Sequence, residues 1–341
     1  MSKVLAGTLW VTSLLVFPLM GQAQFPQPNG GGLESGVLPA RWLSQEAKCM
    51  EIPEWQVHEY NPEFFILRQS PCTDYEKPFI FLFFGKDRAM LVDTGSRNGN
   101  VVPTLQLTVK NWLARNHRTS IPLIVMHTHP HEDHTWGDKG IQAMNDPAMP
   151  VTFVASEIEA TKRFFGTAKW PEEIGKVDLG GRVFDMIPIP GHSEVSLALY
   201  DRNTGILFAG DSLYPGRLYV QDFPAFQAST ERLIHFTEGK PIAHILGNHI
   251  EQTSTPFLDY PVGTMYQPEE HELALSRGSL LELEDALLSM HGVPQRLALR
   301  DFSIWPSSPK SDNAKEREAY EKRVQTERDK MWDHTKQNSA R

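Results

Sequence analysis

The chain has 341 residues, of which 40% are hydrophobic, and its formal net charge at pH 7 is −9. This is ample for a large buried core; the length alone allows two domains, but α/β enzymes of this size often form one. Because an acidic chain gains no counterion-release energy from nucleic acid, the composition argues against a general nucleic-acid partner.

The first 23 residues have the pattern of a signal peptide. Lys3 precedes an apolar run, Val4–Met20, and small residues stand at Gly21 and Ala23, where a signal peptidase reads the chain. The run is short for a membrane-spanning helix, although an anchor or a buried first helix is the alternative. We therefore expect cleavage after Ala23, a periplasmic or secreted protein, and no stable membrane insertion after cleavage.

The chain then changes character three times. Residues 24–40 are rich in Gly and Pro, so we expect a flexible leader over 24–45 and a catalytic domain over 46–305. Residues 306–341 carry dense mixed charge and predict a helical tail, either solvated or docked.

Short β-rich runs alternate with helical patterns inside the expected domain. Strands are predicted at Gln56–Tyr60, Phe64–Arg68, Phe79–Phe84, Ala89–Val92, Leu123–Met126, Val183–Ile187, Leu197–Tyr200, Ile206–Phe208, Ile242–Leu246 and Leu297–Ile304. Helices are predicted at Thr104–Asn116, Glu157–Phe165, Thr230–Phe236 and Glu270–Met290. Apolar strands that alternate with helices indicate an α/β sandwich.

The chain has two cysteines, Cys49 and Cys72. An exported chain meets oxidising conditions, so a disulfide between them is one expectation and two unpaired thiols are the other. Neither cysteine lies near the histidine motifs in sequence, and we do not expect a thiolate ligand or a cysteine nucleophile.

A dense group of metal-ligand residues follows the predicted strand Leu123–Met126. The run His127-Thr128-His129-Pro130-His131-Glu132-Asp133-His134 places four ligand candidates at HxHxDH spacing, and imidazole and carboxylate both suit zinc. Because Pro130 blocks a continuous helix, we expect a loop that turns its side chains toward two neighbouring centres. The alternative is a chance cluster of surface histidines, and 13 histidines spread over 341 residues argue against it.

Three more ligand candidates stand at the ends of predicted strands. They are His192 in Pro190-Gly191-His192-Ser193, Asp211 in Gly210-Asp211-Ser212, and His249 in Gly247-Asn248-His249. Each signal is weak alone, since a histidine after a glycine is more often an ordinary loop residue. Together they predict a single cleft, because strand ends at one edge of a sheet can converge.

These motifs, with Leu91-Val92-Asp93-Thr94-Gly95, resemble the metallo-β-lactamase superfamily, and most closely its glyoxalase II-like branch, from Phe79 to His249. The resemblance implies an α/β fold, an αββα four-layer sandwich of two mixed β-sheets flanked by helices. It implies two Zn²⁺ per chain, with iron or manganese as alternatives. The implied ligands are His129, His131 and His192 for the first metal, Asp133, His134 and His249 for the second, and Asp211 as the bridge. Asp93 would support the ligand loop, or only cap a turn.

The resemblance also implies a reaction class. A ligand set with Asp211 and His134 and without cysteine resembles hydrolases such as glyoxalase II more than the lactamases that use a cysteine ligand. Ile250-Glu251 follows His249 where glyoxalase II has Glu-Tyr, which argues against a glutathione thioester. We predict a dinuclear zinc hydrolase in which a metal-bound hydroxide attacks the carbonyl of a small-molecule ester, thioester, lactone or lactam. Asp133 would orient the nucleophile or shuttle a proton.

Three other functions remain open from the sequence. They are a periplasmic β-lactamase, an iron-dependent oxygenase or redox protein on the same fold, and a non-catalytic zinc-binding protein. Candidates for substrate contact, although a structural role is the simpler explanation for each, are Tyr214, Tyr219, Glu251, Tyr260 and Tyr266. His127 is either a supporting partner of the ligands or only a strand-end residue, and Trp136 either walls the cleft or packs in the core. The sequence does not identify the substrate or the oligomeric state.

Overall fold

The computed structural model describes residues 32–43 and 51–307. The expected signal peptide, the first part of the leader, Cys49 and the charged tail beyond residue 307 lie outside these ranges. Within the described ranges, none of the helices has the length and apolarity that crossing a membrane requires.

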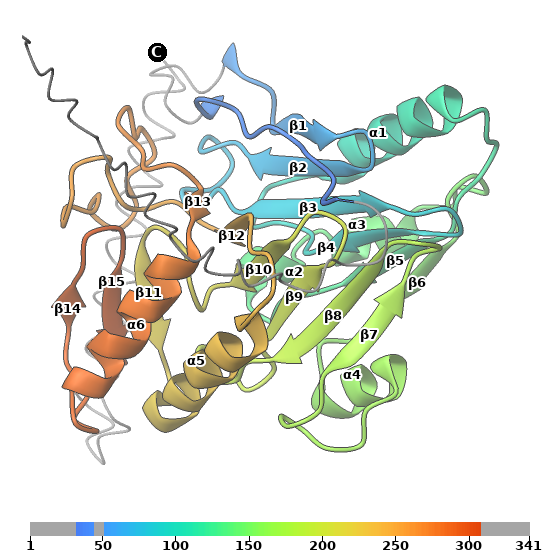
Figure 1. Cartoon of the computed structure of the whole chain (residues 1–341). Helices are drawn as coiled ribbons and strands as arrows, with labels where there is room; N and C mark the ends of the chain where they lie inside the picture. Colours follow the sequence, from blue (N-terminus) through green and yellow to red (C-terminus); the bar gives the residue numbers. More distant parts are fainter. Residues whose placement is uncertain (1–31, 44–50, 308–341) are drawn as a thin grey trace, which may run out of the picture. The chain divides into compact units, whose positions relative to one another are not determined.

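The first sheet contains six strands that follow one another in sequence order (Figure 1). They are β1 (Trp55–Asn61), β2 (Phe64–Gln69), β3 (Phe79–Phe84), β4 (Ala89–Val92), β5 (Leu123–Met126) and β6 (Val151–Phe153). The first three pairings are antiparallel, and β4–β5 and β5–β6 are parallel. Because β2 to β5 are buried on both faces, they appear in the sequence as continuous apolar runs.

The second sheet has the order β13-β12-β10-β9-β8-β7. Its strands are β7 (Gly175–Asp178), β8 (Val183–Pro188), β9 (Leu197–Asp201), β10 (Ile206–Gly210), β12 (His244–Gly247) and β13 (Ala274–Leu275). Only the β10–β12 pairing is parallel. Both sheets therefore mix parallel and antiparallel pairs, as predicted.

Apolar side chains arrange these sheets and helices in four layers. One buried cluster joins the inner faces of the two sheets, where the rings of Phe81 and Phe208 lie 4.7 Å apart. A second joins the outer face of the first sheet to α1 (Val102–Arg115), with Trp112 stacked on Phe84. A third joins the outer face of the second sheet to α5 (Phe223–Thr237) and α6 (Arg277–Ser289). The predicted αββα sandwich is confirmed.

The end of the expected leader packs against the domain. The amide of Val37 donates to the carbonyl of Tyr60 at 3.0 Å, beside β1. Trp42 is buried, and its ring lies 4.7 Å from that of Phe79. Val37 and Trp42 thus contact the domain, and the indole of Trp42 gains free energy from its burial against the aromatic core.

Several predicted boundaries differ from the structure. Helix α5 begins at Phe223 rather than Thr230, because Asp222 caps it and Phe223 and Phe226 are buried. Helix α6 begins at Arg277 rather than Glu270, which instead bridges to Thr253. The shorter helices are α2 (Glu132–Thr135), α3 (Asp138–Ala143) and α4 (Ile158–Phe165), the last predicted within one residue.

A small third sheet replaces the single strand predicted at Leu297–Ile304. That segment forms β14 (Leu297–Ala298) and β15 (Ser303–Pro306), which pair antiparallel. Strand β15 also pairs parallel with β11 (Arg217–Val220). Cys72 is disulfide-bonded, and the only other cysteine of the chain is Cys49.

We expect Phe208→Ala to destabilise the fold strongly. Its ring is fully buried between the sheets, so the truncation should cost about 3–5 kcal/mol of unfolding free energy. Leu107→Ala, on the exposed side of α1, is the control and should change stability by no more than about 0.5 kcal/mol. Urea unfolding curves measure both, and equal losses would contradict the placement of Phe208.

Candidate metal centre

The HxHxDH run is partly loop and partly helix. His129 and His131 lie in a loop after β5, and α2 begins directly after His131 and carries Asp133 and His134. The expectation of a loop throughout was wrong for the second half, because Pro130 excludes helix before itself but not two residues beyond. Asp133 and His134 lie on this single turn of helix, and their ligand atoms belong to the same cluster.

The other ligand candidates also follow strand ends. His192 comes after β8, Asp211 after β10 and His249 after β12. These strands belong to the second sheet, whereas β5 belongs to the first, so the centre lies where the edges of the two sheets meet. Gly191 is required at its position, since its φ is +141° and a Cβ there would lie 2.4 Å from Phe226 Cα.

Three imidazoles form the first ligand group. His129 Nε2 lies 2.9 Å from His131 Nδ1 and 3.2 Å from His192 Nε2, and the last two nitrogens are 3.0 Å apart. Zinc–nitrogen bonds of about 2.0–2.1 Å in a tetrahedron would separate two ligand nitrogens by about 3.3 Å. The three nitrogens thus have nearly the spacing of a zinc site.

The second group combines two imidazoles with two carboxylates. Asp133 Oδ2 lies 3.3 Å from Nε2 of both His134 and His249. Asp211 Oδ2 lies 3.5 Å and 3.4 Å from the same two nitrogens. Within each group, all ligand atoms lie within 4.8 Å of one another. The structure therefore brings together all seven side chains that the sequence singled out.

Asp211 occupies a position between the two groups. Its Oδ2 also lies 3.9 Å from His129 Nε2 and 3.7 Å from His192 Nε2. Its Oδ1 and His134 Nε2 are buried without a hydrogen-bond partner. Buried polar atoms without partners are costly, and a cation between the groups would satisfy both of these atoms. The donor set fits the two divalent ions that the resemblance implies.

Hydrogen bonds from the far side fix how the imidazoles face the centre. His192 Nδ1 lies 2.7 Å from the carbonyl of Tyr219, and His249 Nδ1 lies 3.0 Å from that of Glu76. Because a carbonyl only accepts, each Nδ1 carries a proton, and Nε2 is the nitrogen of each ring that remains to bind a metal.

Asp93 supports this centre through hydrogen bonds to the segments that carry the ligands. It is fully buried with φ of +66°, and its carboxylate accepts from the amide of Thr128 at 2.8 Å and from Asn248 Nδ2 at 2.7 Å. Its Oδ2 lies 3.1 Å from His134 Nδ1, which orients that ring toward the second group. The predicted supporting role of Asp93 is confirmed.

The two groups differ in electrostatic character. Burial lowers the pKa of His131 to about 4, and burial also lowers the pKa of His129 and of His192. Burial acts in the same direction on His134 and His249, but neighbouring carboxylates outweigh it and raise the pKa of both. The first group therefore offers neutral nitrogens, whereas a cation entering the second would displace protons.

Most of the neighbouring candidates have structural contacts. His127 Nε2 lies 2.9 Å from Asp138 Oδ1 and belongs to neither ligand group. Arg217 forms hydrogen bonds with all of Tyr214, Tyr219, Glu251 and Tyr260. The sequence analysis missed Arg217 because no motif marks it. Trp136 and Tyr266 are 43% and 48% exposed.

We expect two substitutions to have different effects on metal content. Asp211→Asn removes the charge shared by both groups and should lower zinc affinity at both positions by at least about 10-fold. His131→Ala should weaken only the position formed with His129 and His192. Zinc titration monitored by calorimetry measures the two affinities, and an unchanged first position in Asp211→Asn would contradict the shared role.

Comparisons with known proteins agree with this centre. A model of the family described as "Metallo-beta-lactamase superfamily" matches residues 76–290. The acyl-coenzyme A thioesterase MBLAC2 of Bos taurus is 24% identical over 231 residues, which cover 59% of this chain and 83% of that protein. The hydroxyacylglutathione hydrolase of Pseudomonas putida (strain GB-1) is 28% identical over 155 residues, covering 44% of this chain and 57% of that protein.

Among solved structures, a metallo-beta-lactamase from Pontibacter korlensis matches with a TM-score of 0.45 and 17% identity, and the match covers 69% of this chain and 99% of that one. The family match extends over more than half of the chain and contains all seven ligand candidates. The chain therefore belongs to the metallo-beta-lactamase superfamily, as a metal-dependent hydrolase.

Proposed function

We propose that the protein is a dinuclear zinc hydrolase that cleaves a small-molecule acyl compound at its carbonyl carbon. The observation that carries this proposal is the position of Asp211, whose Oδ2 lies within 3.9 Å of imidazole nitrogens from both ligand groups. Zinc, when bound, would supply a water of lowered pKa and an electrophile for the carbonyl oxygen.

Asp133 is the residue to which we assign proton transfer. Its side chain is 16% exposed, whereas that of Asp211 is 8% exposed and that of His134 is fully buried. Of these three, Asp133 is the most open to an incoming substrate. A carboxylate there can accept a proton from the attacking water and pass it to the leaving group.

The substrate we favour is an acyl thioester or ester. Two relatives carry the names acyl-coenzyme A thioesterase and hydroxyacylglutathione hydrolase. The ligand groups contain only histidine and aspartate, which separates this chain from the lactamases that use a cysteine ligand. The glutathione moiety itself is not part of the proposal, because Ile250-Glu251 stands where glyoxalase II has Glu-Tyr.

We also propose that the enzyme works in the periplasm or outside the cell. Support comes from the signal-peptide pattern of the first 23 residues and from the disulfide at Cys72, since disulfides persist in oxidising compartments. A small-molecule substrate is the only partner that the proposal requires.

Removal of metal should abolish hydrolysis. Dialysis against a chelator should lower kcat by at least about 100-fold, and added zinc should restore it, because the residues alone offer no strong nucleophile. Metal analysis of the purified protein is the companion measurement. Full activity in verified metal-free protein would refute the mechanism, and bound iron with oxygen consumption would favour redox chemistry instead.

A substrate panel on zinc-loaded protein should place the activity among acyl thioesters and esters. We expect turnover of short acyl thioesters to exceed that of the lactam nitrocefin by at least about 100-fold in kcat/KM. His131→Ala is the control, and it should lose the thioesterase activity. Nitrocefin turnover that matched or exceeded thioester turnover would reverse the assignment in favour of a β-lactamase.

A further inference from the structure

Arg217 lies buried at the start of β11 and is the centre of a dense polar network. Its Nη2 donates to Glu251 Oε1 at 2.7 Å, and its backbone amide donates to Glu251 Oε2 at 2.8 Å. Its Nη1 donates to Asp259 Oδ2 at 2.9 Å, and its Nε donates to the hydroxyl of Tyr219 at 3.2 Å. A planar guanidinium can make such divergent bonds, whereas a lysine ammonium cannot reproduce their geometry.

The network reaches His249 through Glu251. Glu251 stands two residues after His249, and the ring of Tyr214 packs edge-on against His249 at 5.5 Å. The hydroxyl of Tyr214 donates to the Arg217 carbonyl and lies 3.3 Å from Glu251 Oε2. The segment that carries His249 is thus fastened to Arg217 by both a carboxylate and a phenol.

The network reaches Asp211 through the loop between Asp211 and Arg217. The amide of Glu251 donates to the carbonyl of Pro215 at 2.8 Å. Gly247 permits the close contact of the two segments, because a Cβ there would lie 2.4 Å from Tyr214 Cβ. The loops after β10 and β12 are therefore packed directly against each other.

The network reaches His192 through β11. Tyr219, two residues after Arg217, holds His192 Nδ1 with its carbonyl at 2.7 Å. The amides of Gln221 and Asp222 both donate to the carbonyl of Gly191 at 2.9 Å. The same strand that Arg217 begins therefore fixes the loop that carries His192.

We propose that Arg217, through its buried ion pair with Glu251, is a positioning residue that holds the segments bearing His192, Asp211 and His249 at metal-binding distance. The inference rests on the proposed two-metal centre. Arg217 contacts neither metal position, so its effect is transmitted by the carboxylate of Glu251, the phenol of Tyr214 and the backbone of β11. Partners that orient metal ligands from behind commonly alter metal affinity by about 10–100-fold.

The test is a metal titration of Arg217→Lys and Glu251→Gln, followed by the absorption spectrum of the cobalt(II)-substituted proteins. Arg217→Lys keeps the positive charge but loses the planar guanidinium that makes the divergent hydrogen bonds. Glu251→Gln keeps the shape of the side chain but loses its negative charge. We expect zinc affinity at the position containing His249 to fall about 10–100-fold in both. We also expect altered cobalt absorption bands, because the ligand geometry changes.

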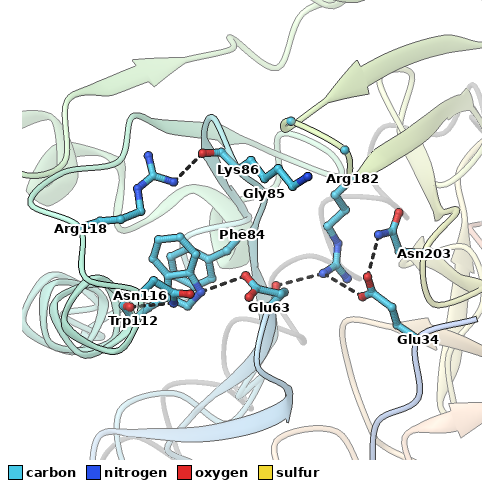
Figure 2. A pocket seen from close by; sticks show the side chains of 12 residues that line it. Glu34, Glu63, Phe84, Gly85, Lys86, Trp112, Asn116, Arg118, Arg182 and Asn203 are labelled. Carbon is cyan, nitrogen blue, oxygen red and sulfur yellow. Dashed lines mark hydrogen bonds and ion pairs between the residues drawn. The ribbon is translucent and has the colours of Figure 1, made fainter.

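Two further variants separate positioning from mere folding. Tyr214→Phe removes one hydroxyl and should weaken the same metal position by a smaller factor, even if the charge variants fold poorly. Arg182→Lys is the matched control, since Arg182 is equally buried and donates to Asp201 Oδ2 at 2.5 Å at the other end of β8 from His192. Arg182 lines a separate cavity of about 370 Å³ (Figure 2), and its variant should bind metal like the wild type.

The outcomes distinguish the two proposals. Wild-type protein that binds two ions, together with Arg217→Lys, Glu251→Gln and Tyr214→Phe variants that bind them equally well and give the wild-type cobalt spectrum, would overturn the role of Arg217 alone. Equal losses of affinity in Arg182→Lys would overturn it too, since the effect would then be general instability. Wild-type protein that binds fewer than two ions would refute the two-metal function, and the inference with it.

Discussion

The carboxylate of Asp93 joins the two sheets at the point where the ligands meet. Asp93 follows β4, and it accepts hydrogen bonds from Thr128 after β5 and from Asn248 after β12. Asn248 is itself tied to β3, because its side chain and its carbonyl both bond to the backbone of Phe79. The buried carboxylate of Asp93 therefore has all of its hydrogen-bond donors only when the two sheets are correctly placed relative to each other.

This constraint explains how a centre assembled from distant segments can be rigid. The first sheet provides His129, His131, Asp133 and His134, and the second provides His192, Asp211 and His249. The aromatic core between the sheets holds the layers together, but apolar packing is not directional. Hydrogen bonds to Asp93, Tyr219 and Glu76 supply the direction for three of the five imidazoles, those of His134, His192 and His249.

The division of charge within the centre is chemically useful. The first group contains three imidazoles and no carboxylate of its own, whereas Asp133 belongs to the second group and Asp211 lies between the two. The two ligand groups therefore differ in the charge that they would present to a bound cation. The Arg217 network lies behind the loops after β10 and β12, which carry Asp211 and His249.

The sequence by itself determined most strands of the two large sheets, the ligand candidates and the family, whereas β6, β7 and β13 were not predicted. Apolar runs such as Phe79–Phe84 and Leu123–Met126 can be recognised because strand burial depends on local composition, and HxHxDH is a local motif. For Asp93 the sequence left two interpretations open. An aspartate that caps a turn and an aspartate that supports the ligand loop look the same in sequence.

Tertiary structure decided everything that depends on contacts between distant residues. The third sheet forms because β11 pairs with β15, more than 80 residues later in the chain. Helix α5 begins before the predicted residue because Phe223 and Phe226 pack against the second sheet. The role of Arg217 could not be predicted from the sequence, because its partners Glu251 and Asp259 lie 34 and 42 residues away along the chain. Local pattern sets which residues are available, whereas only packing sets the distances at which charges and lone pairs act.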